Sequence, residues 1–234
     1  MQGGELFDII AEAGSFSEQQ AAQVTRDVIK GIQYLHMHDI VHRDIKPENV
    51  LCKAKSWPLQ VKLADFGLAN FSKDGEISEQ GTNMIGTPGY VAPEVVKREK
   101  YGPAVDMWAV GVLLYIMLSG KMPFYGRDDN ACLRMTASGK YNMPLKEWSK
   151  ISADAVSLVR GLLQLKPEKR LTANAALQHK WLADPSAASS SPINNDLSGI
   201  HSSRRKFRKA VMATMTVGRI NNLVSLATAN ASSS

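Results

Sequence analysis

The most regular hydrophobic pattern of the chain lies between residues 17 and 36. Its apolar positions recur at helical spacing: Val24, Val28, Ile32 and Leu35. This spacing predicts a long amphipathic helix that ends near His36. Just before it, Ser17 and Gln20 stand at the spacing of a capping box, in which two side chains satisfy N–H groups at a helix start.

Three further helices are predicted downstream. Residues 107–118 are apolar throughout, which is typical of a helix buried on all sides. Residues 152–165 carry an apolar face at helical spacing, and a last helix begins after a capping Thr172. Pro167 separates the last two helices, because proline disfavours helix at the residue before it.

Short strands and one long irregular segment complete the expected secondary structure. Residues 40–42, 50–52 and 61–63 predict short strands. Residues 71–93 are rich in Gly, Ser, Thr and Pro, which predicts a long irregular segment of the kind that usually carries function. The fold class that follows is mainly α, with a few short β-strands.

The composition changes sharply after Leu182. Residues 183–192 consist of Ala, Ser, Asp and Pro, which is typical of a linker. We therefore expect a domain over residues 1–182, a linker over 183–200, a basic segment over 201–222 and a disordered tail over 223–234.

The overall composition is that of a soluble globular protein. Of 234 residues, 44% are hydrophobic and 21% charged, which excludes global disorder, a collagen and a coiled coil. The net charge is +6, yet residues 1–182 contain 22 basic and 20 acidic side chains, whereas residues 183–234 contain 6 and 2. The excess positive charge is thus local. No basic face interleaved with aromatic residues lies outside the C-terminal region, so we expect no nucleic-acid partner.

Cysteine usage and the N-terminus predict a cellular location. Cys52 and Cys132 are the only cysteines, and neither lies in a metal-binding or redox spacing. The first residues show no features of a secretion signal, and the longest apolar stretch is too short to span a membrane. These observations favour a cytoplasmic protein with reduced thiols, with the nucleus as the other location to consider.

Three motifs follow one another in the first domain. His42-Arg43-Asp44 opens the first, and Asp65-Phe66-Gly67 begins sixteen residues after Asn49. Residues 86–94 then read GTPGYVAPE. Any one of these residues alone is best interpreted as structural, but the order and spacing of the three motifs are very specific. The chain resembles the eukaryotic protein kinases over residues 1–182, in particular the serine/threonine kinases of the calcium/calmodulin-dependent group.

The resemblance implies a kinase C-terminal lobe that uses ATP and Mg²⁺. Asp44 would orient the acceptor hydroxyl and take its proton, and Lys46 would neutralise charge on the transferred γ-phosphate. Asn49 and Asp65 would hold Mg²⁺, which prefers oxygen ligands. Leu51 would form the floor under adenine.

Other residues of the pattern would be structural. Glu94 would form an internal ion pair with Arg170, and Asp106 would anchor the backbone of the loop that precedes Asp44. His42 and Phe66 would act as packing elements. The structural set is completed by Arg43 and Gly67.

The resemblance also bears on the substrate. Lys46 and Thr87, both expected close to the catalytic Asp, favour Ser or Thr over Tyr as the acceptor. Glu5 would contact the ATP ribose and an Arg three residues before the acceptor, and Glu48 would add a second carboxylate, since paired carboxylates bind guanidinium well. Pro88 is expected to contribute to substrate binding. The alternative for Glu5 is a carboxylate that simply favours a helix N-terminus.

The activation loop admits two interpretations. Arg43 before Asp44 is a pattern that often accompanies phosphorylation of this loop, for which Ser78 and Thr82 are the candidates. The type II kinases of the group, however, need no phosphate there.

The resemblance begins inside the kinase hinge. The N-terminal lobe, with its Gly-rich loop and phosphate-gripping lysine, is expected to be missing. The sequence is then either a fragment of a longer kinase or a truncated, catalytically inactive module that binds calmodulin and substrate peptides. The intact set of Asp44, Lys46, Asn49 and Asp65 favours the fragment.

The basic segment suggests a partner. Between residues 201 and 220 there are six basic residues and no acidic one. Arg204, Arg205 and Lys206 precede apolar residues at positions four apart, Phe207, Val211 and Met215. This pattern is typical of calmodulin-binding helices and resembles the regulatory segment of the type II kinases. We therefore expect protein substrates and calcium-loaded calmodulin as partners. A solvated basic tail or a nuclear-import run is the alternative.

Overall fold

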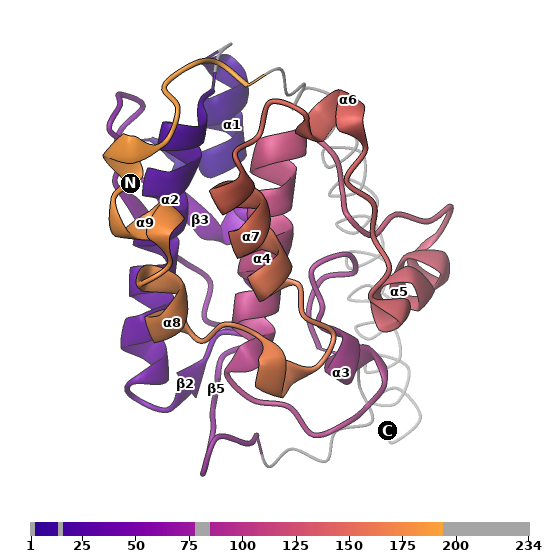
Figure 1. Cartoon of the computed structure of the whole chain (residues 1–234). Coiled ribbons are helices and arrows are strands. Elements are labelled where there is room, and N and C mark those ends of the chain that lie inside the picture. Colours follow the sequence, from indigo (N-terminus) through magenta and orange to yellow (C-terminus); the bar gives the residue numbers. More distant parts are fainter. Residues whose placement is uncertain (1–2, 14–15, 78–84, 194–234) are drawn as a thin grey trace, which may run out of the picture. The chain divides into compact units, whose positions relative to one another are not determined.

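The computed structural model describes residues 3–13, 16–77 and 85–193. Its centre is built from three helices, α2 (Glu18–His36), α4 (Ala104–Ser119) and α7 (Ala153–Leu162). Helix α4 packs against both α2 and α7 (Figure 1). The described part of the chain is mainly helical, as the sequence predicts.

Helix α2 begins as the sequence predicts. The Ser17 hydroxyl accepts a hydrogen bond from the Gln20 N–H at 3.3 Å, and the Gln20 side-chain oxygen accepts one from the Ser17 N–H at 2.9 Å. The predicted apolar positions, Val24, Val28, Ile32 and Leu35, are buried. The capping box and the end at His36 are therefore confirmed.

Helix α4 is buried on every side. All of its residues from Val105 to Ser119 are buried, including the polar side chain of Asp106 in the first turn. The helix ends at Gly120, which adopts a left-handed conformation with φ of 71°. The prediction of a helix without a solvent face is confirmed.

Helix α7 ends three residues earlier than predicted. Its last residue is Leu162, because the chain folds back and the Leu171 N–H donates to the Gly161 carbonyl at 3.0 Å. The Gln164 carbonyl accepts two bonds from the Arg170 side chain, at 3.1 and 3.0 Å. Tertiary hydrogen bonds thus replace the last predicted helical turn.

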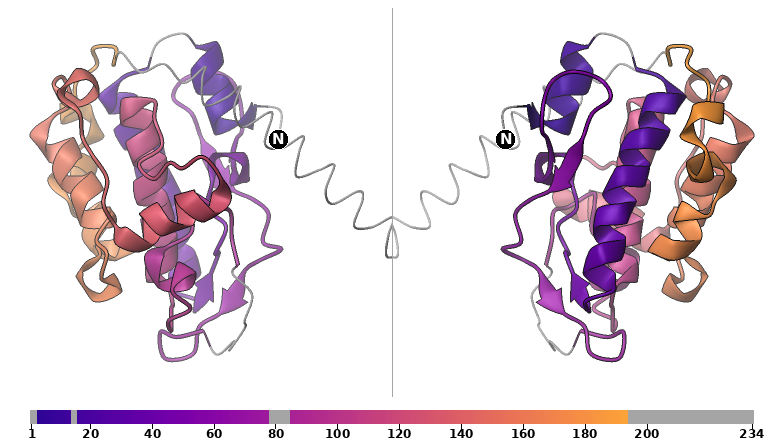
Figure 2. Two further views of the ribbon diagram at one scale, coloured as in Figure 1. Left: turned by 90° about the vertical axis from the view of Figure 1, so that its right-hand side faces the viewer. Right: turned by 90° about the vertical axis from the view of Figure 1, so that its left-hand side faces the viewer.

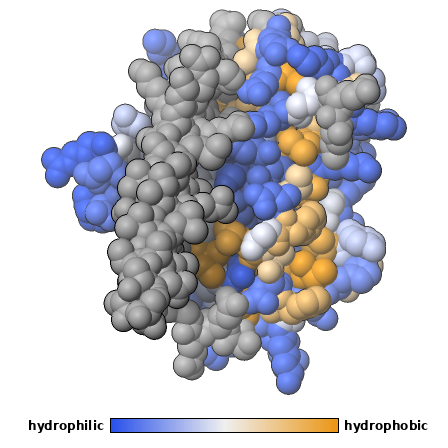
Figure 3. All heavy atoms as spheres, turned by 180° about the vertical axis from the view of Figure 1, so that it is seen from behind, coloured by the Kyte–Doolittle hydropathy of each residue, from blue (hydrophilic) through white to orange (hydrophobic). Residues whose placement is uncertain are grey.

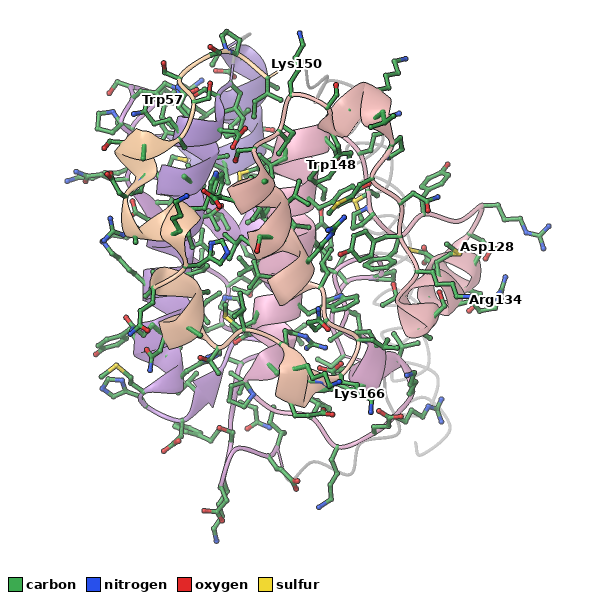
Figure 4. All side chains as sticks on the ribbon, in the orientation of Figure 1. Trp57, Asp128, Arg134, Trp148, Lys150 and Lys166 are labelled. Atoms are coloured by element: carbon green, nitrogen blue, oxygen red, sulfur yellow. The ribbon has the colours of Figure 1, made fainter. Side chains whose placement is uncertain are left out.

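Shorter helices surround this centre. Helix α8 (Ala173–Leu177) is capped by Thr172, as predicted, and lies beside α2, as does α9 (Lys180–Ala183), which the right-hand view of Figure 2 shows. Trp148 packs on Tyr115 of α4 with ring centroids 4.8 Å apart, and Asp128 caps α5 (Figure 4). The other described helices are α1 (Leu6–Glu12), α3 (Pro93–Val96), α5 (Asp129–Ser138), α6 (Leu145–Trp148), and the 3-10 turns η1 (Pro47–Asn49), η2 (Pro167–Lys169) and η3 (Pro185–Ala187).

Two small antiparallel sheets carry the strands. In the first, β3 (Val50–Cys52) pairs with β1 (Gly4–Glu5) on one side and β4 (Val61–Leu63) on the other. In the second, β2 (Ile40–Val41) pairs with β5 (Asn70–Phe71). The strands at 50–52 and 61–63 are confirmed. The strand predicted over 40–42 stops at Val41, since the His42 N–H is bound by the Asp106 carboxylate instead of a neighbouring strand.

The segment predicted to be irregular contains little regular structure where it is described. Between β5 and α3, residues 72–77 and 85–92 form turns and one isolated bridge, Lys73 with Glu76. Ser78 and Thr82, the candidate phosphorylation sites, lie outside the described residues.

The chain after Leu182 makes defined contacts as far as residue 193. The Gln19 N–H donates to the Ser189 carbonyl at 3.0 Å, and the Ile193 N–H donates to the Phe16 carbonyl at 2.7 Å. This part of the expected linker therefore runs along the start of α2. The rest of it, the basic segment and the tail expected after it lie outside the described residues.

Among the described helices, none combines the length and apolar character that crossing a membrane requires. On the face seen from behind in Figure 3, hydrophilic residues cover much of the described surface, with hydrophobic ones between them.

Candidate active site

The first turn of α4 anchors the loop that carries Asp44. The buried Asp106 carboxylate accepts the N–H groups of two consecutive residues, His42 at 2.9 Å and Arg43 at 2.8 Å. Its Oδ2 also contacts the Nε2 of His36, at the end of α2, at 2.9 Å. The carboxylate is desolvated, so these charge-assisted bonds define the loop conformation strongly. The sequence does not indicate the contact with His36, except that this histidine is placed at a helix end.

The His42 side chain is a fully buried link between the loop and β4. Its Nδ1 accepts the Asp44 N–H at 3.4 Å, so the Nε2 carries the proton and donates to the Ala64 carbonyl at 3.1 Å. The His42 ring packs on the Phe66 ring with centroids 5.0 Å apart. Phe66 itself is half exposed.

Three polar side chains meet at the Asp44 carboxylate. Lys46 Nζ donates to Oδ2 at 2.6 Å, and the Asn49 amide nitrogen donates to the same oxygen at 3.0 Å. The Thr87 hydroxyl donates to Oδ1 at 2.7 Å and accepts from Lys46 Nζ at 3.0 Å. Asp44 and Asn49 are buried, whereas the Lys46 side chain is 20% exposed. The cluster therefore holds a carboxylate in one orientation beside a cation at the surface.

Asn49 and Asp65 lie next to paired strands of one sheet, Asn49 just before β3 and Asp65 two residues after β4. Asn49 ends η1, just before β3, and its carbonyl accepts the Ala64 N–H at 2.9 Å, one residue before Asp65. Asp65 has a positive φ of 61°, and its Oδ1 accepts the Gly67 N–H at 3.2 Å. This left-handed backbone, rare outside glycine, exposes the carboxylate where the strand ends.

These two residues suit a magnesium ion. The Asn49 amide nitrogen is engaged by Asp44, through its carboxylate and its backbone carbonyl at 2.7 Å, which directs the amide oxygen elsewhere. One amide oxygen and one exposed carboxylate form the kind of hard donor set that Mg²⁺ accepts together with phosphate oxygens. The donor set therefore fits the metal that the resemblance implies.

The residues expected around ATP lie on β1, η1 and β3. Glu5 is opposite Leu51 in the register of β1 and β3, and η1, which contains Glu48, lies against β1. Glu5 and Glu48 are both half-buried. The fold therefore brings the three residues together where β1 lies beside η1 and β3.

The 86–94 motif is fixed against the Asp44 loop by a close backbone approach. Gly86 has a φ of 112°, and a Cβ on it would lie 3.1 Å from the Arg43 carbonyl oxygen. The turn that follows includes Pro88 and is closed by the Tyr90 N–H, which donates to the Thr87 carbonyl at 3.0 Å. Glycine at position 86 thus allows Thr87 to reach Asp44.

Glu94 and Arg170 form a buried ion pair. The two guanidinium nitrogens lie 2.7 and 3.0 Å from the two carboxylate oxygens, and the Arg170 Nη1 also donates to the Ala104 carbonyl at 2.8 Å. The guanidinium stacks over the Trp108 ring, with its Cζ 5.0 Å from the centroid. The pair joins the start of α3 to the start of α4 and to η2.

Sequence reasoning missed another buried carboxylate, at the start of α2. Glu18 accepts the Ser152 N–H at 2.8 Å, the Ser152 hydroxyl at 2.6 Å and the Trp181 indole N–H at 3.1 Å. It joins α2, α7 and α9. A carboxylate in a first helical turn is ordinary, so the sequence contains no sign of this role.

The remaining candidates cannot be placed. Those of the basic segment lie outside the described residues: Arg204, Arg205, Lys206, Phe207, Val211 and Met215.

Comparison with known proteins defines the class of this site. The family described as "Protein kinase domain" matches residues 1–182, which is more than three quarters of the chain. The chain therefore belongs to the protein kinase family.

Individual relatives show which protein kinases the chain is similar to. The chain is 38% identical over 220 residues to calcium/calmodulin-dependent protein kinase type II subunit delta of Oryctolagus cuniculus, an alignment that covers 93% of this chain and 41% of that protein. It is 38% identical over 225 residues to calcium/calmodulin-dependent protein kinase type II of Caenorhabditis elegans, covering 95% and 31%. It is also 42% identical over 195 residues to a probable myosin light chain kinase of Dictyostelium discoideum, covering 82% and 55%. The chain spans between 31% and 55% of the length of these relatives.

Proposed function

We propose that this chain carries the catalytic region of a cytoplasmic serine/threonine protein kinase, which transfers the γ-phosphate of ATP to protein substrates. The observation that carries the proposal is the Asp44 carboxylate, held at once by Lys46, Asn49 and Thr87. A carboxylate fixed by donors on three sides can orient a hydroxyl group and accept its proton.

The proposed reaction transfers the γ-phosphoryl group of ATP to a substrate hydroxyl group. The substrate hydroxyl oxygen bonds to the γ-phosphorus, the bond to the ADP oxygen breaks, and the hydroxyl proton passes to Asp44. Lys46 supplies positive charge next to the transferred group. Asn49 and Asp65 would hold Mg²⁺, whose chemistry is to neutralise charge on the phosphates.

A phosphotransfer assay tests the proposal on the full chain. We expect transfer from ATP to a serine peptide, with a loss of about 10²- to 10⁴-fold in Asp44→Asn, since this is the usual contribution of a general base. Asp154→Asn is the matched control, because Asp154 lies on α7 and contacts Lys180 at 3.0 Å. A wild-type chain that binds the peptide and calmodulin but transfers no phosphate would instead support the inactive interaction module.

We further propose that substrates carry an arginine three residues before the acceptor. Support comes from the two half-buried carboxylates Glu5 and Glu48, whose elements β1 and η1 lie against each other. Charge-assisted hydrogen bonds contribute about 1.5–3 kcal/mol each, so replacing that arginine by alanine in the peptide should reduce kcat/KM at least about tenfold. Glu48→Gln should remove most of this preference. Equal rates for the two peptides would reject it.

We also propose that calcium-loaded calmodulin regulates the kinase through residues 201–222. The support is the basic and apolar pattern of this segment, together with the similarity to kinases whose names include calmodulin dependence. Titration of the full chain with labelled calmodulin should give calcium-dependent binding. Phe207→Asp should abolish this binding, whereas Leu223→Asp, an equivalent change outside the segment, should not. Binding that persists without calcium, or in Phe207→Asp, would contradict the proposal.

A further inference from the structure

A tight hairpin lies between the Asp65 turn and the segment that begins at residue 78. The Lys73 N–H donates to the Glu76 carbonyl at 2.7 Å, and the Glu76 N–H donates to the Lys73 carbonyl at 3.0 Å. The two residues between them, Asp74 and Gly75, have positive φ of 53° and 80°. Asp-Gly is a preferred pair for such a turn, so the sequence itself specifies the hairpin.

The hairpin is docked on the loop before α4. A Cβ on Gly102 would lie 2.0 Å from the Gly75 carbonyl oxygen, so only glycine permits this approach. The Ile77 N–H donates to the Tyr101 carbonyl at 3.0 Å. We refer to residues 73–77 together with 100–102 as the latch. Its exposed ion pair, Lys100 with Glu76 at 2.8 Å, adds little because it is solvated.

The Tyr101 hydroxyl group of the latch contacts the loop that carries Asp44. The Tyr101 hydroxyl accepts a hydrogen bond from the Arg43 Nη1 at 3.2 Å, and the Arg43 Nε donates to the Leu68 carbonyl at 2.6 Å. Leu68 directly follows the Asp65-Phe66-Gly67 motif. The guanidinium of Arg43 is thus held between the turn that carries Asp65 and the latch.

The conformation of Arg43 matters for Asp44, the next residue. Arg43 has a positive φ of 66°, which is unfavourable for a residue with a side chain and must be maintained by its contacts. Asp106 binds its backbone N–H at 2.8 Å, while the two bonds above hold its side chain. Tyr101, Arg43, Asp44 and Thr87 also line one small cavity. Tyr101 is therefore linked to the proposed base, Asp44, through the residue that directly precedes it.

We propose that Tyr101 is a positioning residue. When the hairpin is docked, the Tyr101 hydroxyl group holds the Arg43 side chain, and Arg43 in turn helps to fix the orientation of Asp44. The consequence for catalysis rests on the proposed function. The physical coupling between latch and Arg43 does not, and it can be measured without turnover.

The coupling is tested with two variants of the full chain. Tyr101→Phe removes only the hydroxyl group, and should raise the rate at which phenylglyoxal modifies Arg43 by about three- to tenfold, as expected for the loss of one hydrogen bond. Gly102→Ala should displace the hairpin, which speeds both hydrogen exchange at the Ile77 amide and modification of Arg43. Tyr125→Phe, at a tyrosine that is 77% exposed, is the control and should change neither.

The outcomes separate this inference from the proposed function. Faster Ile77 exchange in Gly102→Ala with unchanged Arg43 modification would overturn the coupling, and so would unchanged modification in Tyr101→Phe. Melting temperatures identify any variant that fails to fold. For an active chain, Tyr101→Phe should lower kcat for the peptide and leave the KM for ATP unchanged. An inactive wild-type chain would count against the proposed function alone, because the labelling results still decide the coupling.

Discussion

Arg170 donates two parallel hydrogen bonds to the carboxylate of Glu94, and both side chains are almost completely shielded from water. Removing one partner of such a pair leaves a buried charge without compensation, which costs about 3–5 kcal/mol. We therefore expect Glu94→Gln to lower the free energy of unfolding by that amount in urea titrations. Lys100→Ala, which breaks an exposed pair, should leave the urea midpoint unchanged. A Glu94→Gln protein as stable as the wild type would show that the buried pair does not support the fold.

Substitution of Asp106 is also expected to lower the free energy of unfolding. Asp106→Asn conserves the size of the side chain but removes its charge, and places an amide group opposite the N–H donors of His42 and Arg43. Hydrogen bonds to charged groups contribute about 1.5–3 kcal/mol each, so we expect a loss of at least about 2 kcal/mol of stability. Hydrogen exchange at the Arg43 amide should accelerate more than exchange in α7. Uniform acceleration across both would contradict a local anchor.

Glu18 should contribute to stability without affecting chemistry. Glu18→Gln replaces the charged acceptor of Ser152 and Trp181 with a neutral one, which should cost about 1–3 kcal/mol. The emission of Trp181 should also change, since its indole N–H loses a carboxylate partner. Thermal unfolding followed by tryptophan fluorescence measures both effects. Glu12→Gln, at an exposed position on α1, is the control.

Burial raises the pKa of the Cys52 thiol from its ordinary value of 9.0 to about 11. The thiolate therefore forms more readily in the unfolded chain than in the folded one. This contribution to stability is present below pH 9 and is lost as the pH rises towards 11. Cys52→Ala should remove that part of the alkaline loss of stability, as measured by urea titrations at pH 8 and pH 10.5.

The same protonated state predicts slow alkylation. Iodoacetamide reacts with the thiolate, so Cys52 should react slowly at pH 8 in the native protein and rapidly in urea, followed by mass spectrometry. Rapid alkylation of Cys52 in the native state would contradict its burial.

Local patterns in the sequence predicted the long elements and their caps. Ser17 and Gln20 specify the start of α2 because the capping box lies within four residues, and the apolar run of α4 already implies burial on all sides. Helices α3 and α6 have four residues each, too few to show a period. Helix α5 was missed for another reason: it buries only Thr136, so it has no clear apolar face.

Interactions distant in the sequence explain the other differences. Glu18 and Ser152 are 134 residues apart, and no local pattern links them. The strand expected to include His42 and the helix expected to continue past Leu162 were both shortened by tertiary hydrogen bonds. The motifs 42–49, 65–67 and 86–94 indicated which residues would belong to one site. Their arrangement around Asp44, and the contact between Arg43 and Tyr101, required the folded structure.

Helix α4 sets the spacing of two separate parts of the molecule. Asp106 in its first turn holds the loop of Asp44, and Trp108, two residues later, packs under Arg170. One residue inserted between them would rotate one side chain by about 100° relative to the other, so both could not retain their partners. Loops elsewhere can vary in length between related chains, but the spacing of Asp106 and Trp108 cannot. A residue inserted directly after Asp106 or directly after Met107 should therefore prevent folding, whereas insertions at the exposed residues 53–56 should be tolerated.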